Sequence, residues 1–186
     1  MAIYADLRAR YGEAHRAYHT LAHVADCLAW LDQVRPLLAR PREAELALWF
    51  HDAIYDPRRA DNEAQSAALA AAALPALGLD AAAVGRVADL IRQTSHTENV
   101  LAGDGALICD IDLAILGAPP VAFARYDAAI RQEYAWVPDD IFGRERARLL
   151  EVFLARPRLY FTPYFSERLE AQARANLALA MARYRA

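Results

Sequence analysis

Helix-favouring sequence, interrupted by glycine and proline, runs through almost the whole chain and leaves little room for a β-sheet. Alanine is abundant, valine and isoleucine are sparse, and only 7 glycines are present, so helix propensity dominates. Pro41, Gly117 and Pro138 mark boundaries between apolar-periodic blocks. The periodicity predicts an all-α fold of about nine helices, at about 2–15, 20–38, 42–55, 61–76, 80–96, 105–116, 120–134, 139–155 and 166–184.

The length and apolar content suit one domain. The chain has 186 residues, of which 56% are hydrophobic, and this supplies enough apolar surface for one core. The sequence contains no internal repeat, no long polar linker and no low-complexity segment beyond an alanine-rich stretch at 67–73 that reads as helix. We therefore expect a single-domain helical bundle over residues 1–186.

The charge and the apolar pattern argue against two classes of partner. The formal net charge is -3, whereas sequence-independent binding of nucleic acid needs clustered positive charge. No apolar run approaches the roughly 20 residues that span a bilayer, and no basic leader precedes an apolar core. We expect a cytoplasmic protein that binds a small molecule, with neither polynucleotide nor membrane as partner.

Residue types that are scarce exclude several kinds of catalysis. All 21 positively charged residues are arginine, which excludes Schiff-base chemistry and a phosphate-loop lysine. The three serines, Ser66, Ser95 and Ser166, lie outside any Gly-x-Ser-x-Gly turn. Cys27 and Cys109 occur on apolar helical stretches without metal-ligand or redox spacing. We expect both to be small buried thiols in a reducing compartment.

The dipeptide His51-Asp52 ends an apolar run, with His23 upstream and Asp112 downstream. An imidazole and a carboxylate in apolar surroundings need a partner, and a shared divalent cation satisfies both. His19 and His23 are four residues apart, so on a helix they project from one face and can chelate a metal. Adjacent helical residues are about 100° apart, so His51 and Asp52 would reach an ion between their faces. Mixed imidazole and carboxylate ligands leave positions for water and substrate, which indicates a catalytic metal site.

The order of these residues resembles the signature of the HD superfamily of metal-dependent phosphohydrolases. That signature is a histidine, then a His-Asp pair, then a distant aspartate, each on a different helix. The matching segments here are residues 18–23, 48–52 and 110–113. Segments 61–67 and 114–117, with the Tyr- and Arg-rich C-terminal third, resemble an uncharacterised bacterial subgroup of predicted HD phosphohydrolases. The resemblance covers essentially the whole chain.

The resemblance implies a helical fold and one divalent metal ion bound by His23, His51, Asp52 and Asp112. Such an ion lowers the pKa of a bound water for attack on phosphorus. We expect the substrate to be a small phosphate monoester or diester, with a nucleotide as the first choice. Mn, Fe, Co, Ni, Zn and Mg are all candidate ions, because ligand type and affinity order alone do not select one.

Two positions near the expected ligands allow more than one interpretation. Asp110 and Asp112 would be about 200° apart on a helix, so they cannot both face one ion, and apolar neighbours surround both. Only the resemblance favours Asp112, which leaves Asp110 to cap the helix or to bond a ligand histidine. We expect His96 to act in catalysis through phosphate contact or a second ion, against the alternative of an exposed helix-end histidine. His96 stands alone in the interval where two-metal HD enzymes place two histidines, which favours one ion.

Further residues are candidates for proton transfer and for substrate binding. Glu63 can orient water or act as general base, or can simply belong with Asp61 and Asn62 to a helix N-terminus. An anionic substrate needs cationic partners. The arginine pool is Arg16, Arg58, Arg59, Arg131 and Arg144, and we expect Arg16, Arg58 and Arg131 to bind substrate together with His19. Aromatic residues that can stack on a base, but that more often form core, are Tyr126, Tyr134, Trp136, Tyr160 and Tyr164.

Two other functions remain open at this point. One is a binding or sensory module that keeps the metal site and recognises a phosphorylated ligand without turnover. The other is oxygenase chemistry with two irons, against which the missing second histidine counts. The apolar stretch 159–165 can form part of the core or of a homodimer interface.

Overall fold

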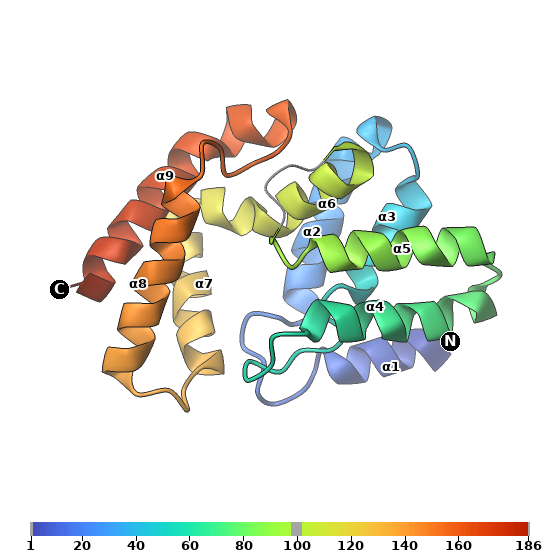
Figure 1. The fold of residues 1–186 in the computed structure, drawn as a ribbon, viewed down its shortest axis with the longest axis horizontal. Helices are drawn as coiled ribbons and strands as arrows, with labels where there is room; N and C mark the ends of the chain where they lie inside the picture. The colour runs from blue at the N-terminus through green and yellow to red at the C-terminus, as the bar shows by residue number, and fades with distance from the viewer. Residues whose placement is uncertain (1, 98–101, 186) are drawn as a thin grey trace. The chain divides into compact units, whose positions relative to one another are not determined.

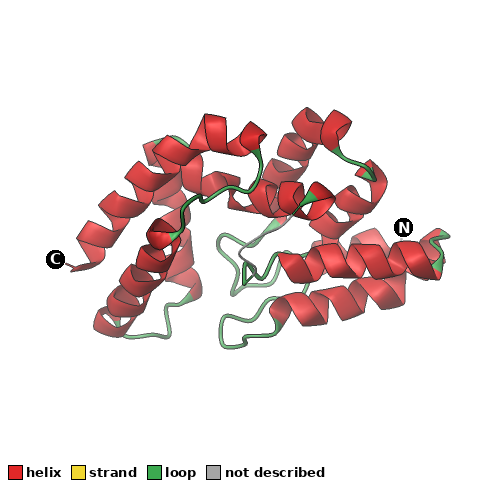
Figure 2. Ribbon diagram, turned by 45° about the horizontal axis from the view of Figure 1, so that its top comes forward, coloured by secondary structure: helices red, strands yellow, loops and turns green. Residues whose placement is uncertain are grey.

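Every regular element in the described part of the chain is a helix. The computed structural model describes residues 2–97 and 102–185, and these ranges contain no strand (Figures 1 and 2). The predicted all-α class with about nine helices is confirmed. The elements are α1 (Ala2–Arg10), α2 (Leu21–Val34), η1 (Arg35–Leu37), α3 (Pro41–Phe50), α4 (Asn62–Ala73), η2 (Leu74–Leu77), α5 (Ala81–Gln93), α6 (Gly103–Asp112), η3 (Leu113–Gly117), α7 (Pro120–Glu133), α8 (Asp139–Ala155) and α9 (Pro163–Arg185), where η denotes a 3₁₀ helix.

The chain divides into two compact units, Met1–Asp112 and Leu113–Ala186. The first unit holds α1 to α6, and the second holds η3 and α7 to α9. All four predicted metal ligands belong to the first unit. The prediction of a single domain over 1–186 stays a prediction.

Small buried residues let the central helices of the first unit pack closely. Ala44 and Ala47 on α3, and Ala67 and Ala70 on α4, are fully buried. Both helices pack against α5, and α4 and α5 form a hairpin (Figure 1). An alanine at a helix contact brings the two backbones together while keeping helix propensity high. The alanine-rich segment predicted simply as helix is therefore also a packing surface.

Side-chain hydrogen bonds hold the starts of two helices that carry expected ligands, α2 and α6. The Thr20 hydroxyl accepts a hydrogen bond from the Ala22 amide at 3.3 Å and caps the start of α2. The Asp104 carboxylate, in the first turn of α6, accepts the amides of Ala39 and Arg40 at 2.8 Å each. The start of α6 is thereby joined to the segment that precedes α3.

Helix α3 ends at Phe50, although the periodicity predicts helix as far as residue 55. Beyond it, the Arg16 guanidinium donates to the carbonyl oxygens of Asp52 at 2.8 Å and Ala53 at 3.2 Å. In a continuing helix these carbonyls would be bonded by amides four residues further along the chain. The side chain of Arg16 satisfies them instead. His51 and Asp52 therefore lie in a turn, whereas the periodicity predicted that both lie on a helix.

Three other predicted helix ends also differ. The first helix ends at Arg10 and not near residue 15, and the fifth ends at Gln93 and not near residue 96. The last begins at Pro163 and not near residue 166. His96 therefore lies beyond α5, and its backbone has a positive φ of 55°, a conformation that non-glycine residues seldom adopt. Tertiary contacts can stabilise such a residue where local propensity does not.

A buried ion pair holds the three long helices of the second unit together. Asp127 on α7 accepts two hydrogen bonds from the Arg146 guanidinium on α8, each 3.2 Å long. From α9 it also accepts the Tyr184 hydroxyl at 2.9 Å and the Arg183 guanidinium at 3.2 Å. Burial, together with the Asp127 charge and hydrogen bond, raises the pKa of Tyr184 to about 12. The Tyr184 phenol therefore remains a neutral hydrogen-bond donor at physiological pH.

Substitution of Asp127 by alanine is expected to lower the free energy of unfolding by about 3–5 kcal/mol, because Arg146 is then a buried cation without its partner. Urea unfolding of the full chain, followed by the helical circular dichroism signal, measures this loss. Asp140→Ala is the control: Asp140 pairs with Arg144 at 3.5 Å on the surface, and its loss should cost less than about 1 kcal/mol. Equal stability of the two variants would contradict a structural role for the buried pair.

Candidate metal centre

His23 enters the site from the first turn of α2. It lies on the buried side of this helix with Val24, Cys27 and Leu31, and only 3% of its side chain is exposed. The spacing of these residues places them on one face of a helix. Helix α2 thus presents an imidazole among apolar side chains, as the sequence predicts.

His51 is held in the orientation and tautomer that suit a metal ligand. Its Nδ1 lies 2.8 Å from the carbonyl oxygen of Leu48. Because a carbonyl can only accept, Nδ1 carries the proton, and in the neutral ring the lone pair is on Nε2. Metal-binding histidines commonly donate their other ring N–H to such an acceptor. The backbone of α3 therefore directs the free nitrogen of His51 toward the site.

Arg16 positions the turn that carries His51 and Asp52. Its side chain is fully buried, and it donates to the carbonyl oxygens of His19, Asp52 and Ala53. It also pairs with the Glu13 carboxylate at 3.0 Å. These bonds use four of the five guanidinium N–H donors. This placement does not match the predicted contact of Arg16 with substrate phosphate, and it makes Arg16 a positioning residue.

Asp112 is the last residue of α6, and its two carboxylate oxygens contact different histidines. Its Oδ1 lies 3.0 Å from Nε2 of His23 and 3.5 Å from Nε2 of His51. Its Oδ2 lies 2.8 Å from Nε2 of His96. The structure thus brings His96 to the cluster as an orienting partner of Asp112. Asp110 is fully buried on the same helix, and its predicted bond to a ligand histidine stays a prediction.

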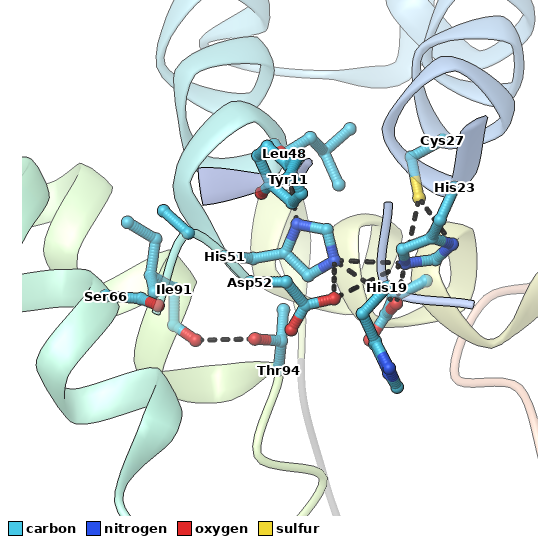
Figure 3. Close-up of polar contacts among 12 residues, drawn as sticks. Tyr11, His19, His23, Cys27, Leu48, His51, Asp52, Ser66, Ile91 and Thr94 are labelled. Carbon is cyan, nitrogen blue, oxygen red and sulfur yellow. Dashed lines mark hydrogen bonds and ion pairs between the residues drawn. The ribbon is translucent and has the colours of Figure 1, made fainter. Parts of the chain in front are cut away.

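The donor atoms of the four predicted ligands lie close together, and Figure 3 shows those of His23, His51 and Asp52. Nε2 of His23 lies 3.1 Å from Nε2 of His51, and Oδ2 of Asp52 lies 3.0 Å from the second nitrogen and 3.7 Å from the first. Ligands bound at about 2.0–2.1 Å from an ion stand about 2.9 Å apart at a right angle and about 3.4 Å apart at the tetrahedral angle. With the distances to Asp112, the two imidazole nitrogens lie from each other and from the carboxylate oxygens of Asp52 and Asp112 at spacings that fit a coordination sphere.

Cys27 also belongs to this cluster. The ligand atoms of His23, Cys27, His51 and Asp112 all lie within 4.8 Å of one another, and this group can hold a metal ion. The predicted burial of Cys27 and Cys109 is confirmed, but the interpretation that Cys27 lacks metal-ligand spacing is wrong. The signal was its spacing of four residues from His23, which places both on one helix face.

Each charge in the cluster changes the proton affinity of its neighbours. Burial by itself lowers the pKa of His51, but the charges and hydrogen bonds of Asp52 and Asp112 raise it well above its usual value. Burial alone would raise the pKa of both carboxyls, but the nearby imidazoles hold those pKa values well below the usual range. Burial, reinforced by the two carboxylates, raises the pKa of the Cys27 thiol. A cation bound here would replace the proton that His51 otherwise holds.

The remaining predicted site residues of the first unit differ in how they relate to the ligand cluster. The His19 ring stacks on Tyr55 with centroids 4.1 Å apart, and its charge acts on Asp52. Arg58 is exposed in the loop that follows the His-Asp pair. Glu63 lies half-buried in the first turn of α4. Among the described residues, no hydrogen bond or ion pair joins the Glu63 carboxylate to the cluster.

Arg131 belongs to the second unit and holds a turn there. Its guanidinium donates to the carbonyl oxygens of Tyr134 and Val137 and pairs with the Asp139 carboxylate. It also lies over the ring of Phe142, with 4.7 Å between the guanidinium carbon and the ring centroid. These contacts connect the end of α7 to the start of α8. The predicted role of Arg131 in substrate binding stays a prediction.

The predicted aromatic and apolar residues of the second unit divide between core and surface. Tyr160, with Leu159 and Phe165 of the stretch 159–165, is buried. The Tyr160 hydroxyl donates to the carbonyl oxygen of Leu113 at 3.2 Å. Trp136 is half exposed. These three residues of the apolar stretch therefore contribute to the core of this unit, and the possible homodimer stays a prediction.

Comparisons with known proteins add no relative. No family model, no curated protein and no solved structure matches the chain. Within the described ranges, no single helix has the length and apolarity to cross a bilayer, and the bent pair Gly103–Gly117 and Pro120–Glu133 passes that test by length and composition alone. The interpretation of the site therefore depends on its own geometry.

Metal affinity is expected to fall as pH falls, because a proton on His51 competes with the cation for Nε2 and the neighbouring carboxylates raise the pKa of this ring. Below that pKa, each pH unit should lower the apparent affinity up to about tenfold. Isothermal titration calorimetry with Zn²⁺ between about pH 6 and about pH 8 measures the slope.

Two histidine variants make this test specific. His51→Gln should abolish tight binding, whereas His15→Gln should keep both the affinity and its pH dependence. His15 is the matched control because it lies outside the cluster, with its Nε2 2.8 Å from the carbonyl oxygen of Tyr55. Affinity independent of pH in the wild type would contradict the ligand role of His51.

Proposed function

We propose that the protein is a metal-dependent phosphohydrolase of the HD type that acts on a small phosphate monoester or diester, with a nucleotide as the expected substrate. One observation carries the proposal. His23, the pair His51-Asp52, and Asp112 come from three separate segments of the chain, and their donor atoms lie 3.0–3.7 Å apart wherever an imidazole nitrogen meets another donor. Their order along the chain, a histidine, a His-Asp pair and an aspartate, is the one that resembles HD hydrolases.

Burial of the donor groups supports a reactive site and not a closed structural one. The side chains of His23 and His51 are 3% and 1% exposed, whereas those of Asp52 and Asp112 are 13% and 15% exposed. Solvent therefore reaches the cluster on its carboxylate side. Catalytic metal sites keep such an open position for water and substrate.

A divalent cation held by these four residues would polarise a phosphoryl oxygen and lower the pKa of a water molecule. The imidazoles of His23 and His51 would fix its position. Asp52, at the open side, would accept the proton of the attacking water. His96 would hold Asp112 in place through its 2.8 Å contact.

The surroundings of Asp52 suit a small phosphorylated molecule. His19 lies beside this carboxylate and is half-buried, so we propose that its ring contacts a phosphoryl oxygen. The half-exposed ring of Tyr55 stacks on His19. Aromatic faces next to a phosphate contact fit a nucleobase or another planar group.

Phosphate release from a panel of nucleotides and phosphoesters, with added Mn²⁺, Co²⁺, Ni²⁺, Mg²⁺ or Zn²⁺, tests the proposal. We expect metal-dependent turnover that Asp52→Ala lowers at least about a hundredfold, because the variant loses a ligand. Asp89→Ala is the control: Asp89 is exposed on α5, where it pairs with Arg92, and its removal should leave turnover unchanged.

The other outcomes separate the rival functions. If the wild type binds one metal per chain and turns over no substrate, hydrolysis is contradicted and a module that senses a phosphorylated ligand is favoured. Two irons per chain would indicate oxygenase chemistry instead. Turnover that survives in Asp52→Ala would contradict the proposed ligand set.

A further inference from the structure

The sulfur of Cys27 lies against the proposed metal ligands. Sγ is 3.7 Å from Nε2 and 3.8 Å from Nδ1 of His23, one helical turn away on α2. It lies within 4.8 Å of the donor atoms of His51 and Asp112 as well. Figure 3 shows the thiol next to the His23 ring, on the side of the cluster that α2 covers. Cys27 is only 1% exposed, so no bulk water competes for this position.

We propose that Cys27 supplies a thiolate ligand to the metal centre and thereby selects a thiophilic cation such as Zn²⁺ or Co²⁺ over Mg²⁺ or Mn²⁺. The inference rests on the proposed metal site and adds a donor atom to it. Sulfur ligands favour softer, later transition ions, whereas carboxylate and water ligands suit Mg²⁺ and Mn²⁺. The substitution of one donor type therefore changes which metal the protein holds.

The Cys27 sulfur lies within reach of an ion bound by the other donor atoms, since all these ligand atoms are within 4.8 Å of one another. Zinc binds sulfur at about 2.3 Å and nitrogen at about 2.0–2.1 Å, so at the tetrahedral angle the two ligand atoms stand about 3.6 Å apart. The Sγ to Nε2 distance is 3.7 Å, but Sγ also lies 3.8 Å from Nδ1, so the sulfur rests against the ring and the Cys27 side chain would have to turn toward the ion to bind it. On binding, a sulfur–metal bond forms, and the thiol proton leaves to solvent through the carboxylate side.

The second cysteine shows that a buried thiol in this fold can be satisfied differently. Sγ of Cys109 donates to the carbonyl oxygen of Gln93 at 3.2 Å, so this thiol has a backbone acceptor. Both hydrogen-bond contacts of the Cys27 sulfur are with the ring nitrogens of His23. The other buried residues of α2 besides His23 are Val24, Leu31 and Val34. A purely apolar role at position 27 would be filled as well by such a residue.

Absorption spectroscopy of the full-length protein loaded with Co²⁺ tests the proposal without measuring activity. We expect one Co²⁺ per chain and a near-ultraviolet band from sulfur-to-cobalt charge transfer. Cys27→Ser should lose the band, and Cys109→Ser, the matched control, should retain it. In competition titrations, Cys27→Ser should bind Zn²⁺ at least about tenfold more weakly than the wild type, with Mn²⁺ affinity changed less than about threefold.

The outcomes distinguish failure of this inference from failure of the metal site. A wild-type protein that binds one Co²⁺ without the charge-transfer band would overturn the role of Cys27 and leave the four-ligand site in place. A wild-type protein that binds no Co²⁺ at all would overturn the metal site and the sulfur ligand with it. A band that Cys109→Ser removes and Cys27→Ser keeps would make Cys109 on α6 the sulfur ligand and would overturn the role of Cys27. Because the wild-type spectrum decides the main question, the test does not depend on the folding of Cys27→Ser.

Discussion

The arrangement of the first unit depends on the burial of two imidazoles and two carboxylates at one point. Polar groups taken out of water cost free energy unless each finds a partner, and charges cost more. Here the ligand atoms of His23, His51, Asp52 and Asp112 are each other's partners, and the lowered pKa values of the two carboxyls show how strongly the imidazoles act on them. A shared cation would replace the proton that His51 otherwise holds.

Helix ends supply most of this cluster, for a geometric reason. His23 lies in the first turn of α2, His51 follows α3 and Asp112 ends α6. A helix end can direct a side chain into a space that several helices approach, because the chain there is free to turn. The cost is backbone groups without helical partners. Arg16 offsets part of that cost by donating hydrogen bonds to the carbonyl oxygens of Asp52 and Ala53. The same bonds hold the turn that positions His51 and Asp52.

Much of this could be predicted from the sequence, because helix propensity and apolar periodicity are local properties. The helices follow from patterns that neighbouring residues carry, whereas the grouping of His23, His51, Asp52 and Asp112 was predicted from the resemblance to HD hydrolases. The placement of Arg16 could not be predicted, since two of its partners, the carbonyl oxygens of Asp52 and Ala53, lie more than thirty residues away. Cys27 was overlooked for another reason: its spacing from His23 was visible, but a lone cysteine on an apolar face is most often core.

The sequence by itself determined that the chain is helical, where most helices lie and which residue types are available for chemistry. Those properties depend on intrinsic propensities and on the absence of lysine. Tertiary structure alone decided that α3 ends at Phe50, that Asp112 meets His23 and His51, and that a sulfur atom lies beside them. These outcomes depend on which distant groups satisfy buried carbonyls and carboxylates, and such pairings exist only after the helices pack.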